Sequence, residues 1–354
     1  MSASQLNVLS PNIRVSINGK VLSGAALSDL QSVTVVESIE NPSSFKLEFS
    51  NWDLADCRLT WSEDPLFECG NVIQIQMGYG KQLQTMIVGK ITGSEVEFES
   101  ESQPMFTVQG YDFRMLLMRS QATRSFTSTS VSDILRRIAQ KMGMKSETGE
   151  ADLSLDYILQ NNLSDWEFIQ SLATQLGSDV SIEDGKLSIQ PKAAMETPQV
   201  TLSWGENLLE FSARINALTQ VSKIEIRGYD VNTKQAIHSE VNAETQLASW
   251  GAKRVANQFG ENVRSIVTRP VRSQEELDDT AKGEYETLNS DYITAEGTTQ
   301  GNALLRAGTS IQINKVGRSF KGQYYVNSTT HRYRKGRGYY TEFKCKRGTI
   351  QPEI

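Results

Sequence analysis

Hydrophobic and polar residues alternate along much of the chain with a period of two, which predicts β-strands rather than helices. The alternation is clear over residues 12–50, where the dipeptide Asn18-Gly19 lies between two alternating runs and predicts a tight hairpin turn. Residues 52–67 have little periodicity and are expected to form a loop. No part of this region has the pattern of a long helix. Residues 1–117 are therefore expected to form one antiparallel β-barrel or sandwich-like domain.

A second alternating block near the C-terminus is similar to one near the N-terminus. The two blocks, Gly70–Gly110 and Gly308–Gly348, both begin with the pattern Gly-x-x-Ile-Gln-Ile. They also have equal length, because 110 − 70 and 348 − 308 are both 40. An internal duplication explains the agreement, although any two amphipathic β-meanders share the alternation and chance can produce such a match. A duplication would give the chain two similar β-modules.

Two segments between these blocks have the spacing of helices. Ser130 and Ser164 stand where an N-cap is expected, and Ser164 with Glu167 forms a capping-box pattern. Gly143 and Gly177 follow the two apolar runs and predict the ends of the helices. The apolar residues at helical spacing are Val131, Ile134, Leu135, Ile138 and Met142 in the first run, and Trp166, Ile169, Leu172, Ala173 and Leu176 in the second.

The remaining patterns predict the order of the domains. The two helices, a short strand at residues 157–160 and a hairpin across Asp184-Gly185 predict an α/β insert domain at residues 118–198. A second β-barrel domain is expected at residues 199–239 plus 294–350, with SKIEIRGYD as one of its strands. The predicted fold class is α+β, mostly β, with two similar antiparallel β-barrels.

A mostly helical insert is predicted at residues 240–293. Its first part has apolar or small residues at steps of four, and its second part begins with the capping-box pattern Ser273-x-x-Glu276. The residues at helical spacing are Leu247, Gly251, Val255 and Phe259, followed by Leu277, Ala281, Tyr285, Leu288 and Tyr292.

The composition is that of a soluble globular protein, with 38 % apolar and 22 % charged residues in a chain of 354. No run approaches the roughly 18 apolar residues of a membrane-spanning helix, and no secretory signal is visible. The three cysteines, Cys57, Cys69 and Cys345, are few and scattered, which argues against a disulfide framework. With only His238 and His331 and no Cys-x-x-Cys pattern, a structural zinc site is not expected.

Charge is distributed unevenly along the chain. Residues 302–348 contain eleven Lys or Arg and one acid, Glu342, and therefore carry a charge of +10. Because the net charge is −6, the rest of the chain carries about −16. Two interpretations stay open. The basic segment is a strand surface that meets an acidic surface of another subunit, or it contacts nucleic acid, for example inside a channel.

No pattern in the sequence indicates catalysis. The nucleophile motif Gly-x-Ser-x-Gly and the phosphate-binding motif Gly-x-x-x-x-Gly-Lys-Ser/Thr are absent. His331 lies in a basic run with strand character and His238 at a strand end, and neither is next to a cysteine. We therefore predict no catalytic, cofactor-binding or metal-binding residues, no cofactor, and a protein that is not an enzyme.

Two segments resemble phage late-control protein D and the VgrG-type tail (baseplate) hubs. One is SFTSTSVSDILRRIAQKMGMK followed by LQNNLSDWEFIQSLATQLGSDVSIEDGKLSIQP, between residues 125 and 191. The other is the closing block from residue 303 to 348, with Gly308, the Gly-x-Tyr-Tyr-Val stretch at Gly322–Val326, His331, and Gly-Tyr-Tyr-Thr at 338–341. Together they cover about a third of the chain.

The resemblance implies a structural central hub of a contractile tail or tail-like injection system. Family hubs are homotrimers whose chains each contribute two β-barrel tube-docking domains, so that three chains adapt a hexameric inner tube to a trimeric spike. It implies as partners the tube or tube-initiator protein, a separate spike protein and other baseplate proteins, with nucleic acid at most passing through a lumen. It also implies assembly in the bacterial cytoplasm into a phage virion tail or an injection particle.

The chain departs from VgrG-type proteins because it stops almost at the end of the closing block. We therefore expect the spike to be a separate polypeptide, as in the late-control protein D arrangement. Two other functions remain as alternatives. One is a baseplate-associated cell-wall hydrolase, which a zymogram on peptidoglycan would reveal. The other is a β-rich nucleic-acid-binding module, which salt-dependent DNA binding would reveal.

Overall fold

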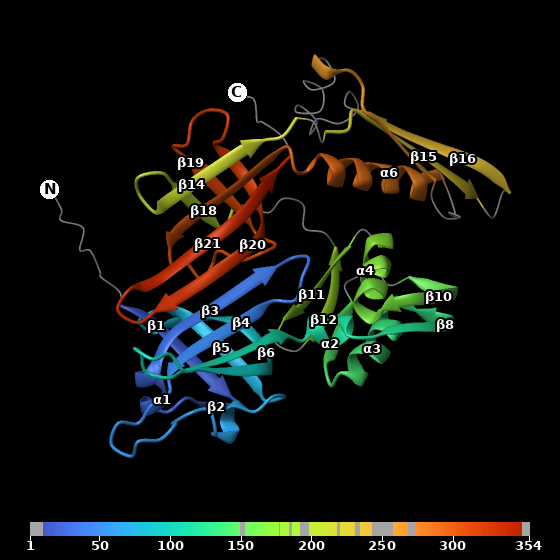
Figure 1. Cartoon of the computed structure of the whole chain (residues 1–354). Helices are drawn as coiled ribbons and strands as arrows, with labels where there is room; N and C mark the ends of the chain where they lie inside the picture. Colours follow the sequence, from blue (N-terminus) through green and yellow to red (C-terminus); the bar gives the residue numbers. More distant parts are fainter. Residues whose placement is uncertain are drawn as a thin grey trace. The chain divides into compact units, whose positions relative to one another are not determined.

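The computed structural model describes residues 10–148, 153–176, 178–183, 186–191, 198–217, 220–230, 234–242, 258–267 and 274–348. The chain divides into two compact units. Unit 1 contains residues 1–196, 301–306 and 329–341, and unit 2 contains residues 197–300, 307–328 and 342–354. Strands account for 56 % and helices for 17 % of the structure, which confirms the predicted mostly β fold (Figure 1).

Seven strands of unit 1 are paired in the order β3-β4-β7-β6-β5-β1-β2, and every neighbouring pair is antiparallel. The predicted hairpin turn at Asn18-Gly19 is confirmed, because both residues have a positive φ, of 48° and 78°. The elements are β1 (Pro11–Ile17), β2 (Lys20–Val21), α1 (Gly24–Asp29), β3 (Leu30–Ser38), β4 (Ser44–Ser50), the 3-10 turn η1 (Pro65–Phe67), β5 (Val72–Tyr79), β6 (Gln82–Glu97) and β7 (Met105–Asp112).

The core of this strand set consists of the apolar residues at every second position, as the period of two requires. Loop residues 52–67 complete the core, because the ring of Phe67 lies 5.1 Å from that of Phe49 and 5.6 Å from that of Phe106. Buried residues of the core include Val15, Ile17, Val33, Val35, Phe45, Leu47, Ile73, Ile75 and Met77.

The α/β segment of unit 1 confirms both predicted helices. Ser130 accepts a hydrogen bond from the Asp133 amide, and Ser164 with Glu167 forms a complete capping box. Gly143, with a φ of 69°, follows the first helix. The elements are α2 (Arg114–Met118), β8 (Gln121–Ser130), α3 (Val131–Lys141), β9 (Lys145–Thr148), β10 (Ser154–Ser164), α4 (Asp165–Gln175), β11 (Ser178–Glu183) and β12 (Lys186–Pro191). β8 pairs with β10, and β12 lies between β11 and β9.

Unit 2 contains a second strand set and a separate small sheet. The set has the order β14-β18-β21-β20, with β19 beside β20 and β13 beside β19. The small sheet has the order β16-β15-β17 and packs against α6. The elements are β13 (Val200–Ser203), β14 (Leu208–Ile215), β15 (Lys223–Asp230), β16 (Gln235–Asn242), β17 (Val263–Val267), α6 (Gln274–Asn289), β18 (Ile293–Gln300), β19 (Ser310–Asn314), β20 (Gly322–Arg334) and β21 (Gly338–Arg347).

The strand SKIEIRGYD pairs differently from our expectation. We expected it among the strands of the second β-barrel, but as β15 it pairs with β16 and β17 in the small sheet. Its apolar residues Ile224 and Ile226 pack against Leu277 and Tyr285 of α6. This packing buries the apolar face of the helix, which would otherwise be exposed to water. The alternation of apolar and polar residues predicts that a segment is a strand, but it does not predict which strands pair with it. β17 is a strand within the segment predicted to be mostly helical.

Some predictions fall on parts of the chain that the structure does not describe. These are Gly177, the turn at Asp184-Gly185, the helical spacing from Leu247 to Val255, and the N-cap Ser273. The domain boundaries predicted from the sequence and the closure of the two barrels also stay predictions. None of the helices in the described part of the chain is long and apolar enough to cross a membrane.

The two strand sets follow the same order. The N-terminal set is β1, β3, β4, β5, β6 and β7, and the C-terminal set is β13, β14, β18, β19, β20 and β21. When the six strands of each set are numbered from one to six along the chain, their order in the sheet is 2-3-6-5-4-1 in both sets. One difference is that β1 is antiparallel to β5, whereas β13 is parallel to β19.

The repeated Gly-x-x-Ile-Gln-Ile pattern occupies the same local structure in both sets. The Gly70 amide donates to the Ile91 carbonyl at 2.8 Å, and the Ile91 amide donates to Asn71 at 3.0 Å. In the second set the Gly308 amide donates to the Val326 carbonyl at 2.8 Å, and the Val326 amide donates to Thr309 at 2.9 Å. Both glycines have a positive φ. Ile91 of β6 therefore corresponds to Val326 of β20.

Candidate functional site

The turn end of the β20–β21 hairpin packs on β3 within unit 1. Residues 329–341 belong to unit 1, and β20 is the hydrogen-bonded neighbour of β3. The Lys335 amide donates to the Gln31 carbonyl at 2.9 Å, and the Thr329 hydroxyl donates to the Glu37 carboxylate at 3.0 Å. Because Lys335 lies near the start of β3 and Thr329 near its end, the two strands run in opposite directions.

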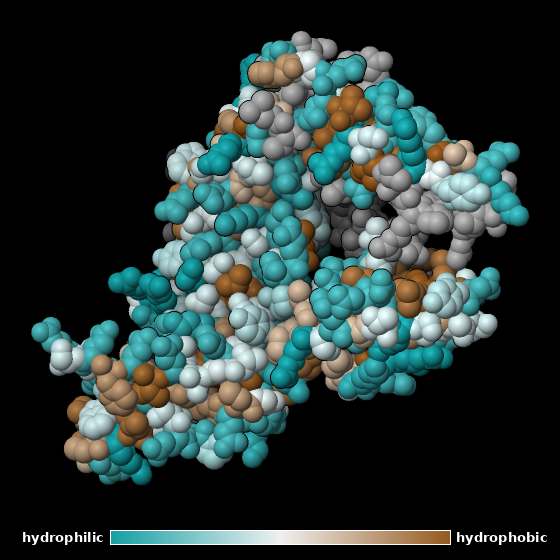
Figure 2. All heavy atoms as spheres, turned by 45° about the vertical axis from the view of Figure 1, so that its right-hand side comes forward, coloured by the Kyte–Doolittle hydropathy of each residue, from teal (hydrophilic) through white to brown (hydrophobic). Residues whose placement is uncertain are grey.

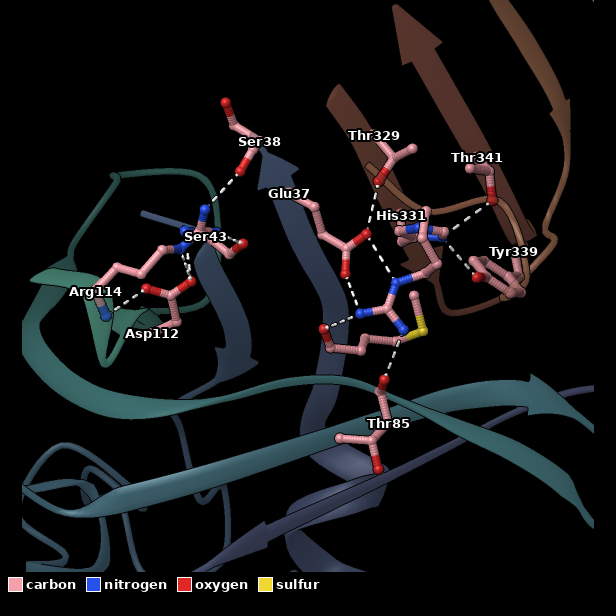
Figure 3. Close-up of polar contacts among 12 residues, drawn as sticks. Glu37, Ser38, Ser43, Thr85, Asp112, Arg114, Thr329, His331, Tyr339 and Thr341 are labelled. Carbon is pink, nitrogen blue, oxygen red and sulfur yellow. Dashed lines mark hydrogen bonds and ion pairs between the residues drawn. The ribbon is translucent and has the colours of Figure 1, made fainter. Parts of the chain in front are cut away.

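Glu37 is the centre of a buried polar network at this contact (Figure 3). Only 5 % of Glu37 is exposed, although it is charged. Arg306 compensates this burial: its Nε donates to Glu37 at 2.8 Å, and its second terminal nitrogen forms an ion pair with the same carboxylate. The guanidinium also donates to the carbonyls of Thr85 and Met86, at 2.9 and 3.0 Å. Arg306 thereby joins β3 to β6 with a planar, multidentate contact.

His331 lies in the same region and is fully buried. Its Nδ1 is 2.7 Å from the Tyr339 hydroxyl and 3.1 Å from the Thr341 hydroxyl, and Figure 3 shows both side chains directed at the imidazole. Burial lowers the pKa of His331 to about 4, and burial also raises the pKa of Tyr339. At neutral pH the imidazole is therefore neutral, and the Tyr339 hydroxyl keeps its proton.

The ion pair of Glu37 and the hydrogen bonds of His331 connect strands and form a structural contact. The hydroxyl groups near His331 belong to Tyr339 and Thr341, which are themselves buried. Burial raises the pKa of the Cys345 thiol, so that this cysteine stays protonated at neutral pH. No group of three or more His, Cys, Asp or Glu side chains in the described residues could hold a metal ion. The predicted absence of catalytic and metal-binding residues stays a prediction.

A second network fixes the turn between β3 and β4. Arg114 donates from Nε to Asp112 at 2.7 Å, from Nη1 to the Ser38 carbonyl at 2.8 Å and from Nη2 to the Ser43 hydroxyl at 2.6 Å. Its guanidinium also lies 5.9 Å from the ring centroid of Trp166. Arg114 thus connects β7 with both the β3–β4 turn and helix α4.

Sequence reasoning singled out His331 but missed Glu37 and Arg306. The signal for Glu37 was present, because Val33, Val35 and Glu37 share one face of an alternating run, and a carboxylate on the buried face requires a partner. The partner could not be found in this way, because Arg306 is 269 positions away in the sequence. His238, the other histidine, lies exposed on β16.

The surface has small apolar groups and two strongly charged hairpin ends. On the face shown in Figure 2, hydrophobic residues form several separate groups among hydrophilic ones. The end of the β6–β7 hairpin is acidic, and its exposed acids are Glu95, Glu97, Glu99 and Glu101. The end of the corresponding β20–β21 hairpin is basic, and its exposed bases are Arg334, Lys335 and Arg337. Equivalent hairpins of the two strand sets thus carry opposite charge.

The fold is that of phage tail proteins. The 43 kDa tail protein of prophage MuSo2 from Shewanella oneidensis is 17 % identical, with a TM-score of 0.74, and the match covers 96 % of this chain and 99 % of that protein. The tail protein from Neisseria meningitidis MC58 is 14 % identical, with a TM-score of 0.72 and coverages of 96 % and 98 %. The E. coli c3393 protein, a component of the type VI secretion system with structural similarity to T4 tail proteins gp27 and gp5, is 12 % identical, with a TM-score of 0.52 and coverages of 96 % and 77 %.

At the level of sequence, residues 8–335 match the model of the family described as Alg8 N-terminal domain, so the chain belongs to this family. A comparison with curated proteins gives no match. The resemblance to late-control protein D and VgrG-type hubs agrees with the neighbours at the level of tail and secretion-system folds. The more specific family assignment stays a prediction.

Proposed function

We propose that the chain is a structural protein of a contractile tail or tail-like injection system, and that it forms the central hub of the baseplate as a homotrimer. The observation that carries the proposal is the fold, which two tail proteins share over 96 % of this chain. The chemistry of the polar networks supports it, because Glu37 and His331 are buried and, together with Arg306, connect strands.

The repeated strand order supports the trimeric form of the proposal. Two strand sets with one order and one local glycine motif give each chain two similar modules. Three chains then present six similar modules, so a threefold protein can meet a sixfold tube on one side and a threefold spike on the other. The proposed partners are the inner tube or tube-initiator protein, a separate spike protein and other baseplate proteins. The proposed location is a virion or injection particle assembled in the bacterial cytoplasm.

The mass of the assembled protein tests this proposal. Three chains of 39.5 kDa give 118.5 kDa, which native mass spectrometry or light scattering coupled to size exclusion separates clearly from a monomer or a dimer. We expect the trimer mass at concentrations of tens of micromolar, and copurification with the separate spike protein. A monomer or dimer mass throughout this range, both alone and with the spike protein, would refute the proposed trimeric hub.

A further inference from the structure

The two strand sets differ in one strand-to-strand contact, and this difference has a consequence for assembly. β20 of the second set lies beside β3 of the first set, but the equivalent contact, between β6 and β14, is not made among the described strands. Within the chain, the far part of β20 lies beside β3, as described above. The equivalent of β20 is β6, and the equivalent of β3 is β14, since these strands hold the same positions in the two sets. The counterpart of the contact would therefore join the far part of β6 to β14.

The far part of β6 has an unpaired edge. β5 pairs with β6 only as far as Lys90. The residues before β5, Gly70 and Asn71, add backbone hydrogen bonds with Ile91, and none is formed beyond it on this side by the described residues. From Gly93 to Glu97, β6 pairs with β7 on one side, and no described strand lies on the other. Val326 corresponds to Ile91, so this stretch matches the part of β20 that lies beside β3.

β14 has the complementary open edge. It pairs with β18 through seven residue pairs, and the order of the described strands ends there, apart from a single bridge between Trp204 and Leu208. Ile215, at the end of β14, is 39 % exposed although it is apolar. Open strand edges with exposed apolar side chains invite pairing with another strand.

Charged and apolar side chains are exposed at both edges. Glu95 and Glu97 on β6 are exposed and form no ion pair among the described residues, and Phe98 beside them is 68 % exposed. β14 carries two exposed charges: Arg214, which has no acidic partner in the described part of the chain, and Glu210, whose carboxylate accepts a hydrogen bond from Thr298. Within the chain, the basic hairpin end packs on β3, where the backbone amide and the side chain of Lys335 donate to the carbonyls of Gln31 and Ser28.

We propose that residues 93–97 of β6 in one copy pair antiparallel with β14 of a second copy. The contact repeats, between chains, the arrangement that β20 and β3 have within one chain. Each copy offers its β6 edge to one neighbour and receives another at β14, which makes a head-to-tail interface that closes into a ring. The inference rests on the proposed ring-forming function and names the surfaces that form the ring.

Disulfide trapping between different molecules tests the pairing. The exposed residues Glu95 and Glu97 are each replaced by Cys in one protein, and Ser212 and Arg214 each in another, with Cys57 and Cys69 changed to Ser in all of them. Antiparallel neighbours place Cα atoms about 4.5–5.5 Å apart, within disulfide range. Each β6 variant is mixed with each β14 variant and oxidised, and the heterodimer is quantified on non-reducing gels.

The four mixtures cover neighbouring registers, and Glu95→Cys mixed with Tyr157→Cys on the exposed face of β10 is the matched control. We expect at least one of the four to give several-fold more heterodimer than the control. If all four remain at the control level while native mass spectrometry reports a trimer, the pairing is refuted and the proposed function stands. A protein that stays monomeric or dimeric, both alone and with the spike protein, refutes both.

Discussion

Replacing Glu37 by Ala removes the acceptor on which the contact between β3 and the β20–β21 hairpin depends. The substitution leaves Arg306 without its counter-charge and the Thr329 hydroxyl without its carboxylate acceptor. Both groups lie in unit 1, so the change acts where the hairpin end packs on β3. The effect is therefore expected on the stability of this unit.

The magnitude follows from the burial of the pair. Removing one partner of a buried ion pair costs about 3–5 kcal/mol, because the remaining charge is left uncompensated. The Glu37 side chain is 7 % exposed, but that of Arg306 is 33 % exposed and keeps two carbonyl acceptors. We therefore expect the lower end, about 3 kcal/mol, which for a unit of this size lowers the Tm by about 6–12 °C. Glu37→Gln keeps an acceptor oxygen and is expected to cost about half as much.

Urea unfolding and scanning calorimetry on the full chain measure this loss. Glu40→Ala is the matched control, because Glu40 lies just beyond β3, is exposed and forms no ion pair among the described residues. The control is expected to change the free energy of unfolding by less than about 0.5 kcal/mol. If Glu37→Ala behaves like Glu40→Ala, the network contributes nothing measurable and our account of this contact is wrong.

Three further experiments test other parts of the structure. Because the pKa of His331 is about 4 in the folded state and about 6.5 in the unfolded chain, the unfolded state binds more protons between these values. Stability should thus fall by up to about 3 kcal/mol as the pH drops from 6.5 to 4, and His331→Gln should flatten this slope in urea unfolding. Gly110→Ala places a methyl group against the backbone carbonyl oxygen of Lys90 and the ring of Phe45 and should cost about 3 kcal/mol or more. Gly24→Ala, with open space around it, should be neutral or slightly stabilising in the same assay; equal effects would contradict the packing argument. Ser164→Ala removes the side-chain acceptor of the Glu167 amide, whereas the backbone amide of residue 164 still donates to the Glu167 carboxylate. The change should cost about 1 kcal/mol in thermal unfolding, and an unchanged Tm would show that the Ser164 side chain is dispensable.

Local patterns were enough to predict the features whose causes are local. The caps at Ser130 and Ser164 and the turn at Asn18-Gly19 depend on interactions within a few residues, and the structure confirms all three. The paired Gly-x-x-Ile-Gln-Ile patterns also correspond to matching backbone hydrogen bonds at Gly70 and Gly308, because a glycine with positive φ before an alternating strand is itself a local feature.

Features that depend on distant partners could not be predicted. The alternating pattern predicted that β15 is a strand. Its place beside β16, β17 and α6 depends on the burial of apolar side chains of α6, which lies elsewhere in the sequence. The Glu37–Arg306 pair joins residues from the two ends of the chain, and no local pattern links them. The buried position of Glu37 on an alternating face was the one available sign that a cationic partner had to exist.

The long separation between β3 and its neighbour β20 also affects folding during synthesis. β3 leaves the ribosome early, whereas Arg306 follows Glu37 by 269 positions. At about 5–20 residues per second, the nascent chain waits roughly 13–54 s before this partner exists. During that interval the β3 edge is open on every ribosome that translates the message, and neighbouring nascent chains on one polysome carry identical edges. Slow translation or crowded polysomes should therefore increase misassembly of this protein before its last fifty residues are made.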